Sequence, residues 1–100
     1  MKKKIIITFY FILVSSAFAD ERMVSGLDVF NNKGQCASCH QLNSAKSEGV
    51  IGPNLDLLRP TFDQVITVVT RGIGVMPAFE GILDLKEIEA VSYFFSESTK

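Results

Sequence analysis

The chain has 100 residues, of which 47% are hydrophobic and 21% are charged, and its formal net charge is −1. A chain of this length forms one domain, and without a basic balance it is a poor binder of nucleic acid, because phosphate contacts need a positive face. The sequence has two cysteines and a single histidine, which excludes a site with two histidine ligands from one chain.

Residues 1–19 are typical of a secretory signal peptide. The lysines at positions 2–4 precede an almost unbroken apolar run from Ile5 to Val14, and residues 17–19 form an Ala-Phe-Ala cleavage pattern. An uncleaved anchor is the alternative, but the run is shorter than the about 20 apolar residues of a membrane span. We therefore expect cleavage after Ala19, export to the periplasm and no membrane insertion of the mature chain.

The mature chain, residues 20–100, would be small and acidic. It keeps seven Lys and Arg against eleven Asp and Glu, a formal net charge of −4. A domain of this size buries a modest core and commonly needs a metal, a disulfide or a cofactor to be robust.

The first helix is predicted from Glu21 to Asn32. Met23, Leu27 and Phe30 recur at helical spacing and define its buried face. Gly26 lies inside this helix, where it lowers helix propensity. The sequence alone leaves open whether Gly26 allows close approach of another helix or has no such role.

Residues 41–60 carry Ser, Gly and Pro without periodicity and are predicted to be loop. A second helix is predicted from Phe62 to Thr70, with Thr61 as its N-cap and Gln64 as the capping-box partner. Its β-branched residues would also suit a strand. We favour the helix because the caps fit and no partner strand is evident.

Residues 71–83 contain three glycines and one proline and are predicted to form a second loop. The last helix is predicted from its N-cap Asp84 to about Glu97, with Glu87 at the third helical position. The expected fold class is therefore all-α, with three to four helices and no convincing strand.

The residues Cys36-Ala37-Ser38-Cys39-His40 carry the clearest chemistry of the chain. Cys-x-x-Cys-His is the spacing that attaches a c-type haem: the two thiols bond to the porphyrin, and His40 can then ligate the iron. A disulfide between cysteines so close together would close a very small loop, and it would leave His40 unexplained. A tetrahedral zinc site is poorly supported, because no second pair of ligands follows.

Met76 is the candidate for the sixth iron ligand. It stands before Pro77 in a loop rich in Gly and Pro, and a thioether ligand raises the reduction potential relative to a second histidine. The alternative is that Met76 is an ordinary packing residue. Met23, the other methionine of the mature chain, falls on a core stripe.

With these motifs in order, the mature chain resembles the short bacterial class I cytochromes c, which have one haem in a helical cytochrome c fold. The resemblance implies that the Pro53 carbonyl, in the turn Gly52-Pro53-Asn54-Leu55, accepts a hydrogen bond from the haem-ligating His40. It also implies that Leu55 packs against the haem and that Met76 lies in a strap over its second face. Arg71 would neutralise a haem propionate, or be a solvated helix-end charge.

The same resemblance makes Gly26 the point of close contact between the first and last helices and packs Phe30 against Tyr93. Two departures from the family are evident. The chain contains no Trp, so the propionate partners are undefined. The mature chain also lacks the basic face of the mitochondrial members, so a partner with a strongly acidic patch is not implied.

The function expected from the sequence is one-electron transfer by a periplasmic monohaem cytochrome, not an enzyme, with one haem c bound through Cys36 and Cys39. Its partners would be redox donors and acceptors that dock transiently at the haem edge. The main alternative is a haem-bearing electron-transfer subunit of a larger dehydrogenase or oxidase complex. A ligand sensor or peroxidase would need a labile Met76 bond, and a dithiol oxidoreductase would need a βαβ pattern, which is not seen.

Overall fold

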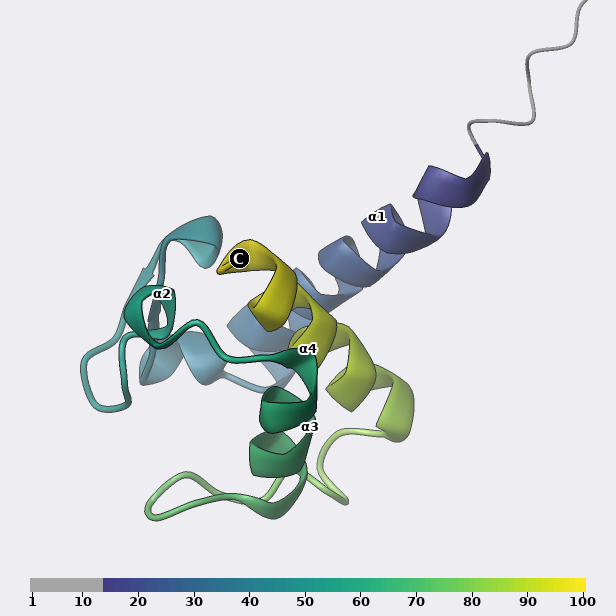
Figure 1. Cartoon of the computed structure of the whole chain (residues 1–100). Coiled ribbons are helices and arrows are strands. Elements are labelled where there is room, and N and C mark those ends of the chain that lie inside the picture. The colour runs from purple at the N-terminus through teal and green to yellow at the C-terminus, as the bar shows by residue number, and fades with distance from the viewer. Residues whose placement is uncertain (1–13) are drawn as a thin grey trace, which may run out of the picture.

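The computed structural model describes residues 14–100, so most of the predicted signal peptide, residues 1–19, lies outside the described residues. Four α-helices account for about half of the described chain, and the long ones pack against one another (Figure 1). They are α1 (Val14–Asp28), α2 (Leu55–Leu58), α3 (Phe62–Arg71) and α4 (Leu85–Ser98). Among residues 14–100, no helix is long and apolar enough to cross a membrane. The all-α prediction is confirmed.

The first helix starts earlier than predicted, at Val14 rather than Glu21. Alanines on either side of Phe18 favour helix, so the helical backbone runs through the predicted cleavage site. At its other end α1 passes into a π-helical turn, Val29–Lys33, which ends at Gly34. The helical path thus reaches Lys33, close to the predicted end at Asn32.

Helices α1 and α4 cross at Gly26, where an ideal Cβ would contact the carbonyl oxygen of Ala90 and come within 2.5 Å of the Phe94 Cβ. Any larger residue would push the two helices apart. The predicted close-contact role of Gly26 is therefore confirmed. Together with the contacts between α3 and α4, this crossing fixes the frame on which the loops are held.

The aromatic contacts of this crossing differ from the expectation. Phe30 is fully buried, and its ring centroid lies 6.0 Å from that of Phe94 and 5.1 Å from that of Phe95, both edge to face. Tyr93 instead lies under the guanidinium of Arg22, 3.8 Å from its ring centroid. The predicted pairing of Phe30 with Tyr93 is wrong because Tyr93 faces the rim of the helix pair and Phe94 and Phe95 face its core.

Helices α3 and α4 begin as the sequence predicted. Thr61 Oγ1 accepts from the Gln64 backbone N–H, and the Gln64 side chain accepts from the Thr61 N–H. At α4 the same reciprocal pair forms between Asp84 and Glu87. These capping boxes satisfy backbone donors that the first helical turn leaves free. They also decide the ambiguous segment after Thr61 in favour of helix.

Residues 41–58 contain short structure where only loop was predicted. Strand β1 (Gln41–Leu42) pairs antiparallel with β2 (Ser47–Glu48), and α2 follows. Tertiary bonds hold these pieces: Ser47 Oγ donates to the His40 carbonyl at 2.9 Å, and Asp56 accepts from the Asn43 N–H at 2.9 Å. The expectation of no strand is thus corrected, because elements of two to four residues carry no periodic signal.

The segment after α3 folds back on that helix. Gly72 has a φ of +76°, and an ideal Cβ there would lie 2.7 Å from the Met76 carbonyl oxygen. The chain then turns between Ile73 and Met76, and the Phe79 N–H donates to the Val69 carbonyl at 2.8 Å. Only glycine combines this positive φ with this close approach. The result is a strap held against the end of α3.

Candidate cofactor-binding site

A cavity of about 510 Å³ lies between the strap, the segment that leads into β1 and the turn before α2. Its walls come from three stretches distant in sequence, together with one side chain of α4. The lining residues are Lys33, Gly34, Gln35, Cys36, Ser38, Cys39, His40, Ile51, Gly52, Pro53, Ile73, Val75, Met76, Pro77, Phe79 and Phe95. The cavity therefore unites both cysteines, the histidine and Met76.

A single tight turn brings the two cysteines to this cavity. Gln35 adopts a left-handed backbone with φ 52°, and a 3₁₀ turn then covers Cys36–Ser38. The backbone N–H groups of Cys39 and His40 both donate to the Cys36 carbonyl, at 3.1 and 3.0 Å. Cys36, Cys39 and His40 are thus held by one local turn. Both thiols are free, with Cys36 buried and Cys39 half-buried.

His40 is held by the turn before α2. Its Nδ1 lies 2.8 Å from the Pro53 carbonyl oxygen, and because a carbonyl only accepts, Nδ1 carries the proton and Nε2 has the free lone pair. Gly52 packs directly on the ring, since an ideal Cβ there would contact Cε1 and lie 2.8 Å from Nδ1. The Gly52 N–H also donates to the Cys39 carbonyl at 2.7 Å. The imidazole is fixed in both orientation and tautomer.

Met76 reaches the cavity from the strap. The backbone groups of Ile73 and Met76 bond reciprocally, with N···O distances of 3.1 and 2.9 Å. This small closed turn presents the half-buried Met76 side chain to the same cavity as His40. A neutral imidazole nitrogen and a thioether sulfur, delivered from two separate loops, form a donor set that suits haem iron.

Two residues singled out from the sequence lie outside this cavity lining. Leu55 is buried, with 4% of its surface exposed, and belongs to the hydrophobic core beneath the site. Arg71 ends α3 and is exposed to solvent. Neither side chain is part of the wall. Their predicted contacts with haem stay predictions.

The structure adds apolar wall residues that the sequence did not single out: Ile51, Ile73, Val75, Phe79 and Phe95. The first three are more than half exposed, at 72%, 65% and 91%. They lie in loops rich in Gly and Pro, where no helical or strand periodicity marks a residue for a particular face. Phe95 reaches the cavity from α4 and is otherwise part of the hydrophobic core.

Lys33 also lines the cavity, and it pairs with α4. Its Nζ lies 2.6 Å from Glu87 Oε2, and the other Glu87 oxygen accepts from the Asp84 N–H at 2.8 Å. The hydrogen bond to Glu87 raises the pKa of Lys33. The same bond, with help from the Asp84 backbone, lowers the pKa of Glu87. The Glu87 carboxylate thus completes the N-terminal cap of α4 and also holds Lys33, which lies just before Cys36 in the chain.

The geometry disfavours two other uses of the cysteines. Burial raises the pKa of the Cys36 thiol to about 11, whereas a redox-active dithiol depends on a lowered thiol pKa. Within residues 14–100, no group of three or more His, Cys, Asp and Glu side chains is arranged to hold a metal ion. The residues fit a cofactor that brings its own metal, accepts two thiols and fills an apolar cavity.

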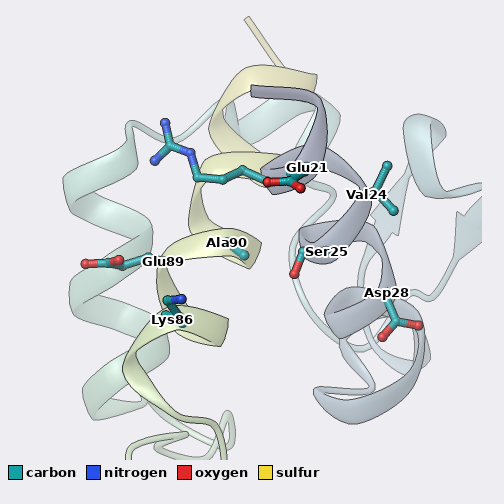
Figure 2. A pocket seen from close by; sticks show the side chains of 8 residues that line it. Glu21, Val24, Ser25, Asp28, Lys86, Glu89 and Ala90 are labelled. Carbon is teal, nitrogen blue, oxygen red and sulfur yellow. The ribbon is translucent and has the colours of Figure 1, made fainter. Parts of the chain in front are cut away.

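A second hollow, of about 780 Å³, lies where α1 and α4 cross, and it has a different character (Figure 2). Its lining includes five charged side chains, Glu21, Arg22, Asp28, Lys86 and Glu89. Figure 2 shows Glu21 and Asp28 on α1, and Lys86 and Glu89 on α4. It shares no residue with the cavity described above. The helical wrap and the Cys-x-x-Cys-His cavity together have the architecture of a c-type cytochrome domain.

Comparisons with known proteins agree with this architecture. A family model described as "Cytochrome C oxidase, cbb3-type, subunit III" matches residues 21–94. A cytochrome c6 of Microcystis aeruginosa is 34% identical over an alignment of 84 residues, and the match covers 75% of this chain and 96% of that protein. A cytochrome c6 of Leptolyngbya boryana is 34% identical over an alignment of 77 residues, and the match covers 70% of this chain and 85% of that protein.

A solved structure is similar as well. The crystal structure of the c-type cytochrome SorU from Sinorhizobium meliloti superposes with a TM-score of 0.75 at 44% identity, and the match covers 80% of this chain and 93% of that one. The chain therefore belongs to the cytochrome c family, as a small class I member. Membership implies haem c and makes the chain a haem-containing electron carrier.

Proposed function

We propose that the chain is an exported monohaem cytochrome that carries one electron at a time, with His40 and Met76 as axial ligands of a haem joined to Cys36 and Cys39. The observation that carries this proposal is the cavity itself, which brings these four side chains together from separate segments. Bound haem supplies an iron that alternates between Fe(III) and Fe(II). The roles of the surrounding residues follow from their positions.

The 3₁₀ turn at Cys36–Ser38 holds two cysteines that both line the cavity, so that each could form a thioether with the same porphyrin. His40 receives its orientation from Pro53 and Gly52. A hydrogen bond from Nδ1–H makes the lone pair of Nε2 a stronger metal ligand and fixes the ring against rotation. Little reorganisation of the ligand then accompanies a change of iron charge.

Met76 and the apolar walls complete the proposed site. A neutral sulfur and aliphatic side chains such as Ile73 and Val75 disfavour the extra positive charge of Fe(III). They therefore favour the reduced state and raise the potential. If His40 and Met76 both hold the iron, the site would offer no place for a substrate, so we assign no catalytic residue. Electrons would pass through the edge of the cofactor to a protein docked there.

The test is a spectroelectrochemical titration of the purified mature protein. We expect one haem, a single reversible one-electron transition, and in the ferric state the charge-transfer band of a thioether bonded to iron. Absence of that band would contradict Met76 ligation. Absence of haem after purification from a host that matures c-type cytochromes would contradict the function as a whole.

Service as a fixed subunit of a larger complex is the second candidate, because the matched family model is described as an oxidase subunit. The two functions differ in a simple property of the native protein. A free carrier migrates on gel filtration at the size of one small chain, whereas a subunit migrates with its complex. Cell fractionation of the same source tests the periplasmic location, and the mass of the protein tests cleavage after Ala19.

A further inference from the structure

The chain reaches the first cysteine through a short segment that departs from α-helical geometry. The π-helical turn Val29–Lys33 follows α1, and it ends where the Gly34 N–H donates to the Val29 carbonyl at 2.7 Å. A π turn is wider than an α-helical turn and is frequent at functional sites. This one brings the buried Gly34 into contact with Cys36.

Gly34 leaves the space in which the Cys36 sulfur lies. An ideal Cβ at Gly34 would lie 3.2 Å from Cys36 Sγ and 3.0 Å from the Val29 carbonyl oxygen, so a neighbouring atom would have to move. The Val29 oxygen belongs to the backbone and is held by the Gly34 N–H, whereas the Cys36 side chain can rotate. Gly34 has an ordinary helical φ of −87°, so its backbone accepts alanine. A methyl group there would therefore act mainly by displacing the sulfur.

Gln35 then turns the chain into the cysteine motif. Its backbone is left-handed, with a φ of 52° and a ψ of 32°, a conformation that carries a steric cost for residues with a Cβ. The Gln35 carbonyl accepts from the Ser38 N–H at 3.1 Å and so begins the 3₁₀ turn that contains Cys36. Backbone strain of this kind persists where the surrounding structure enforces it, and it often marks a functional site.

We propose that Gly34 and Gln35 are positioning residues for the thioether at Cys36: Gly34 leaves room for the sulfur, and the left-handed Gln35 directs Cys36 toward the cavity. The proposal rests on the proposed attachment of haem. In that attachment the thiol adds across a porphyrin vinyl group: a C–S bond forms, the thiol hydrogen passes to the other vinyl carbon, and no oxidant or reductant is consumed. Bond formation requires the sulfur to lie within reach of the vinyl group.

Cys39 depends on different neighbours. Its carbonyl accepts from the Gly52 N–H at 2.7 Å, and its backbone lies against Gly49, where an ideal Cβ would come within 2.6 Å of the Cys39 carbonyl carbon. A change at Gly34 should therefore affect the bond at Cys36 more than the bond at Cys39. The expected product is a protein with one thioether instead of two.

Gly34→Ala, produced in a host that matures c-type cytochromes, tests the role of Gly34. We expect the fraction of holoprotein with two thioethers to fall about twofold to tenfold, the range that corresponds to forcing a side chain off its rotamer. The pyridine haemochrome spectrum reports the remaining vinyl groups, and tandem mass spectrometry of the alkylated protein identifies the free cysteine. Two thioethers in all of the Gly34→Ala holoprotein, or a free thiol at Cys39 instead of Cys36, would overturn this role.

Two further preparations test whether Gly34 acts through the Cys36 sulfur. Gly26→Ala also places a Cβ in a tight contact, against α4, and should lower stability while both thioethers form. In a Cys36→Ala background haem can attach only through Cys39, so adding Gly34→Ala should leave the haem yield unchanged. A further fall in yield in that background would reveal a general folding defect and would overturn the proposal.

Lys46 offers a matched control for Gln35. Both residues are exposed, each flanks a 3₁₀ turn, and their φ values are 52° and 56°. A β-branched residue disfavours this conformation, whereas glycine adopts it readily. Gln35→Val should lower the two-thioether fraction, and Gln35→Gly should preserve it. Lys46→Val should also preserve it, because Lys46 does not line the cavity. Equal losses in the two valine variants would overturn the role of Gln35.

The wild-type protein separates the two levels of the account. Wild-type protein without covalent haem would contradict the proposed function, and this proposal with it. Wild-type protein with two thioethers, together with two thioethers in both Gly34→Ala and Gln35→Val, would contradict the positioning roles alone.

Discussion

The cavity behind the cysteines and the crossing of α1 and α4 differ in backbone structure and in the chemistry of their side chains. Loops form most of the cavity wall, which is largely apolar and includes Cys36, Cys39, His40 and Met76. The crossing is made by two regular helices, and charged side chains from both helices line the hollow there (Figure 2). The two regions therefore have different roles. The helix crossing supports the loops, and the loops carry the residues that would bind the cofactor.

Glycines show this division clearly. Gly26 allows two helices to touch, with Phe94 Cβ at 2.5 Å from the position of an added Cβ. Gly52 allows a turn to lie against the ring of His40. The same property, the missing side chain, thus serves packing at one place and ligand orientation at the other.

The largest effect should come from Cys36→Ala combined with Cys39→Ala. Without the two thiols no thioether to the porphyrin can form, so we expect complete loss of covalent haem. Neither substitution lies in α1 or α4. Haem staining after denaturing electrophoresis measures this. Ser25→Ala, at the crossing, should retain haem and serves as the control. Haem that stays on the double variant after denaturation would contradict attachment at these cysteines.

Met76→Ala should open the sixth iron position. We expect loss of the thioether charge-transfer band and a fall in reduction potential on the order of 0.1 V or more, because axial ligands dominate haem potentials. Met23→Leu is the matched control, since Met23 packs against the core and a similar volume is kept. A band that persists in Met76→Ala would assign the ligand to another residue.

Alanine at Gly52 and at Gly26 should give different phenotypes. At Gly52 the new Cβ meets the His40 ring, so we expect altered haem spectra and potential. At Gly26 it meets the α4 backbone, so we expect a loss of about 1–3 kcal/mol in the free energy of unfolding with the potential unchanged. Denaturant titrations and redox titrations of both variants make the comparison. Identical effects would show that the two regions are not separable.

The smallest effect concerns pH and the pair Lys33–Glu87. The pKa of Glu87 is lowered in the folded chain, chiefly by its hydrogen bond to Lys33. Its stabilisation is therefore complete above the ordinary Glu pKa of about 4.3 and is lost as the pH falls through the lowered folded-state value. Because the pair is exposed, the contribution is small.

Thermal unfolding of the wild type and of Glu87→Gln between pH 7 and pH 3 tests this sign. Gln retains the cap of α4, since its side-chain oxygen still accepts from the Asp84 N–H. The wild type should have the higher Tm near pH 7, and the difference should shrink below about pH 4. A difference of the same size across the whole range would contradict the ion pair.

The sequence predicted the features that local rules govern. The capping boxes at Thr61 and Asp84 predicted where α3 and α4 begin, and the Cys-x-x-Cys-His spacing pointed to a segment that lines the cavity. The hydrogen bond from His40 to Pro53 has the geometry that the family resemblance implied. The family and the all-α class were likewise predicted from the sequence and confirmed by the comparisons.

Features held by contacts within and between irregular segments were missed. Strands β1 and β2 and the four-residue α2 exist because of bonds such as Ser47 Oγ to the His40 carbonyl, which no periodic pattern encodes. The wall residues Ile51, Ile73 and Val75 lie in irregular loops, where apolar spacing has no meaning. The partner of Phe30 depended on the rotation of α4, and a shift of one or two positions along a helix changes the face presented.

The central claim is that the cavity holds one haem joined to Cys36 and Cys39. The pyridine haemochrome spectrum of the purified, denatured protein tests it most directly, because the spectrum reports whether the vinyl groups of the porphyrin have been converted to thioethers. The account predicts one haem per chain, retained by the denatured protein and with the spectrum of two thioether bonds. Haem that is extracted on denaturation, leaving two free thiols, would contradict it.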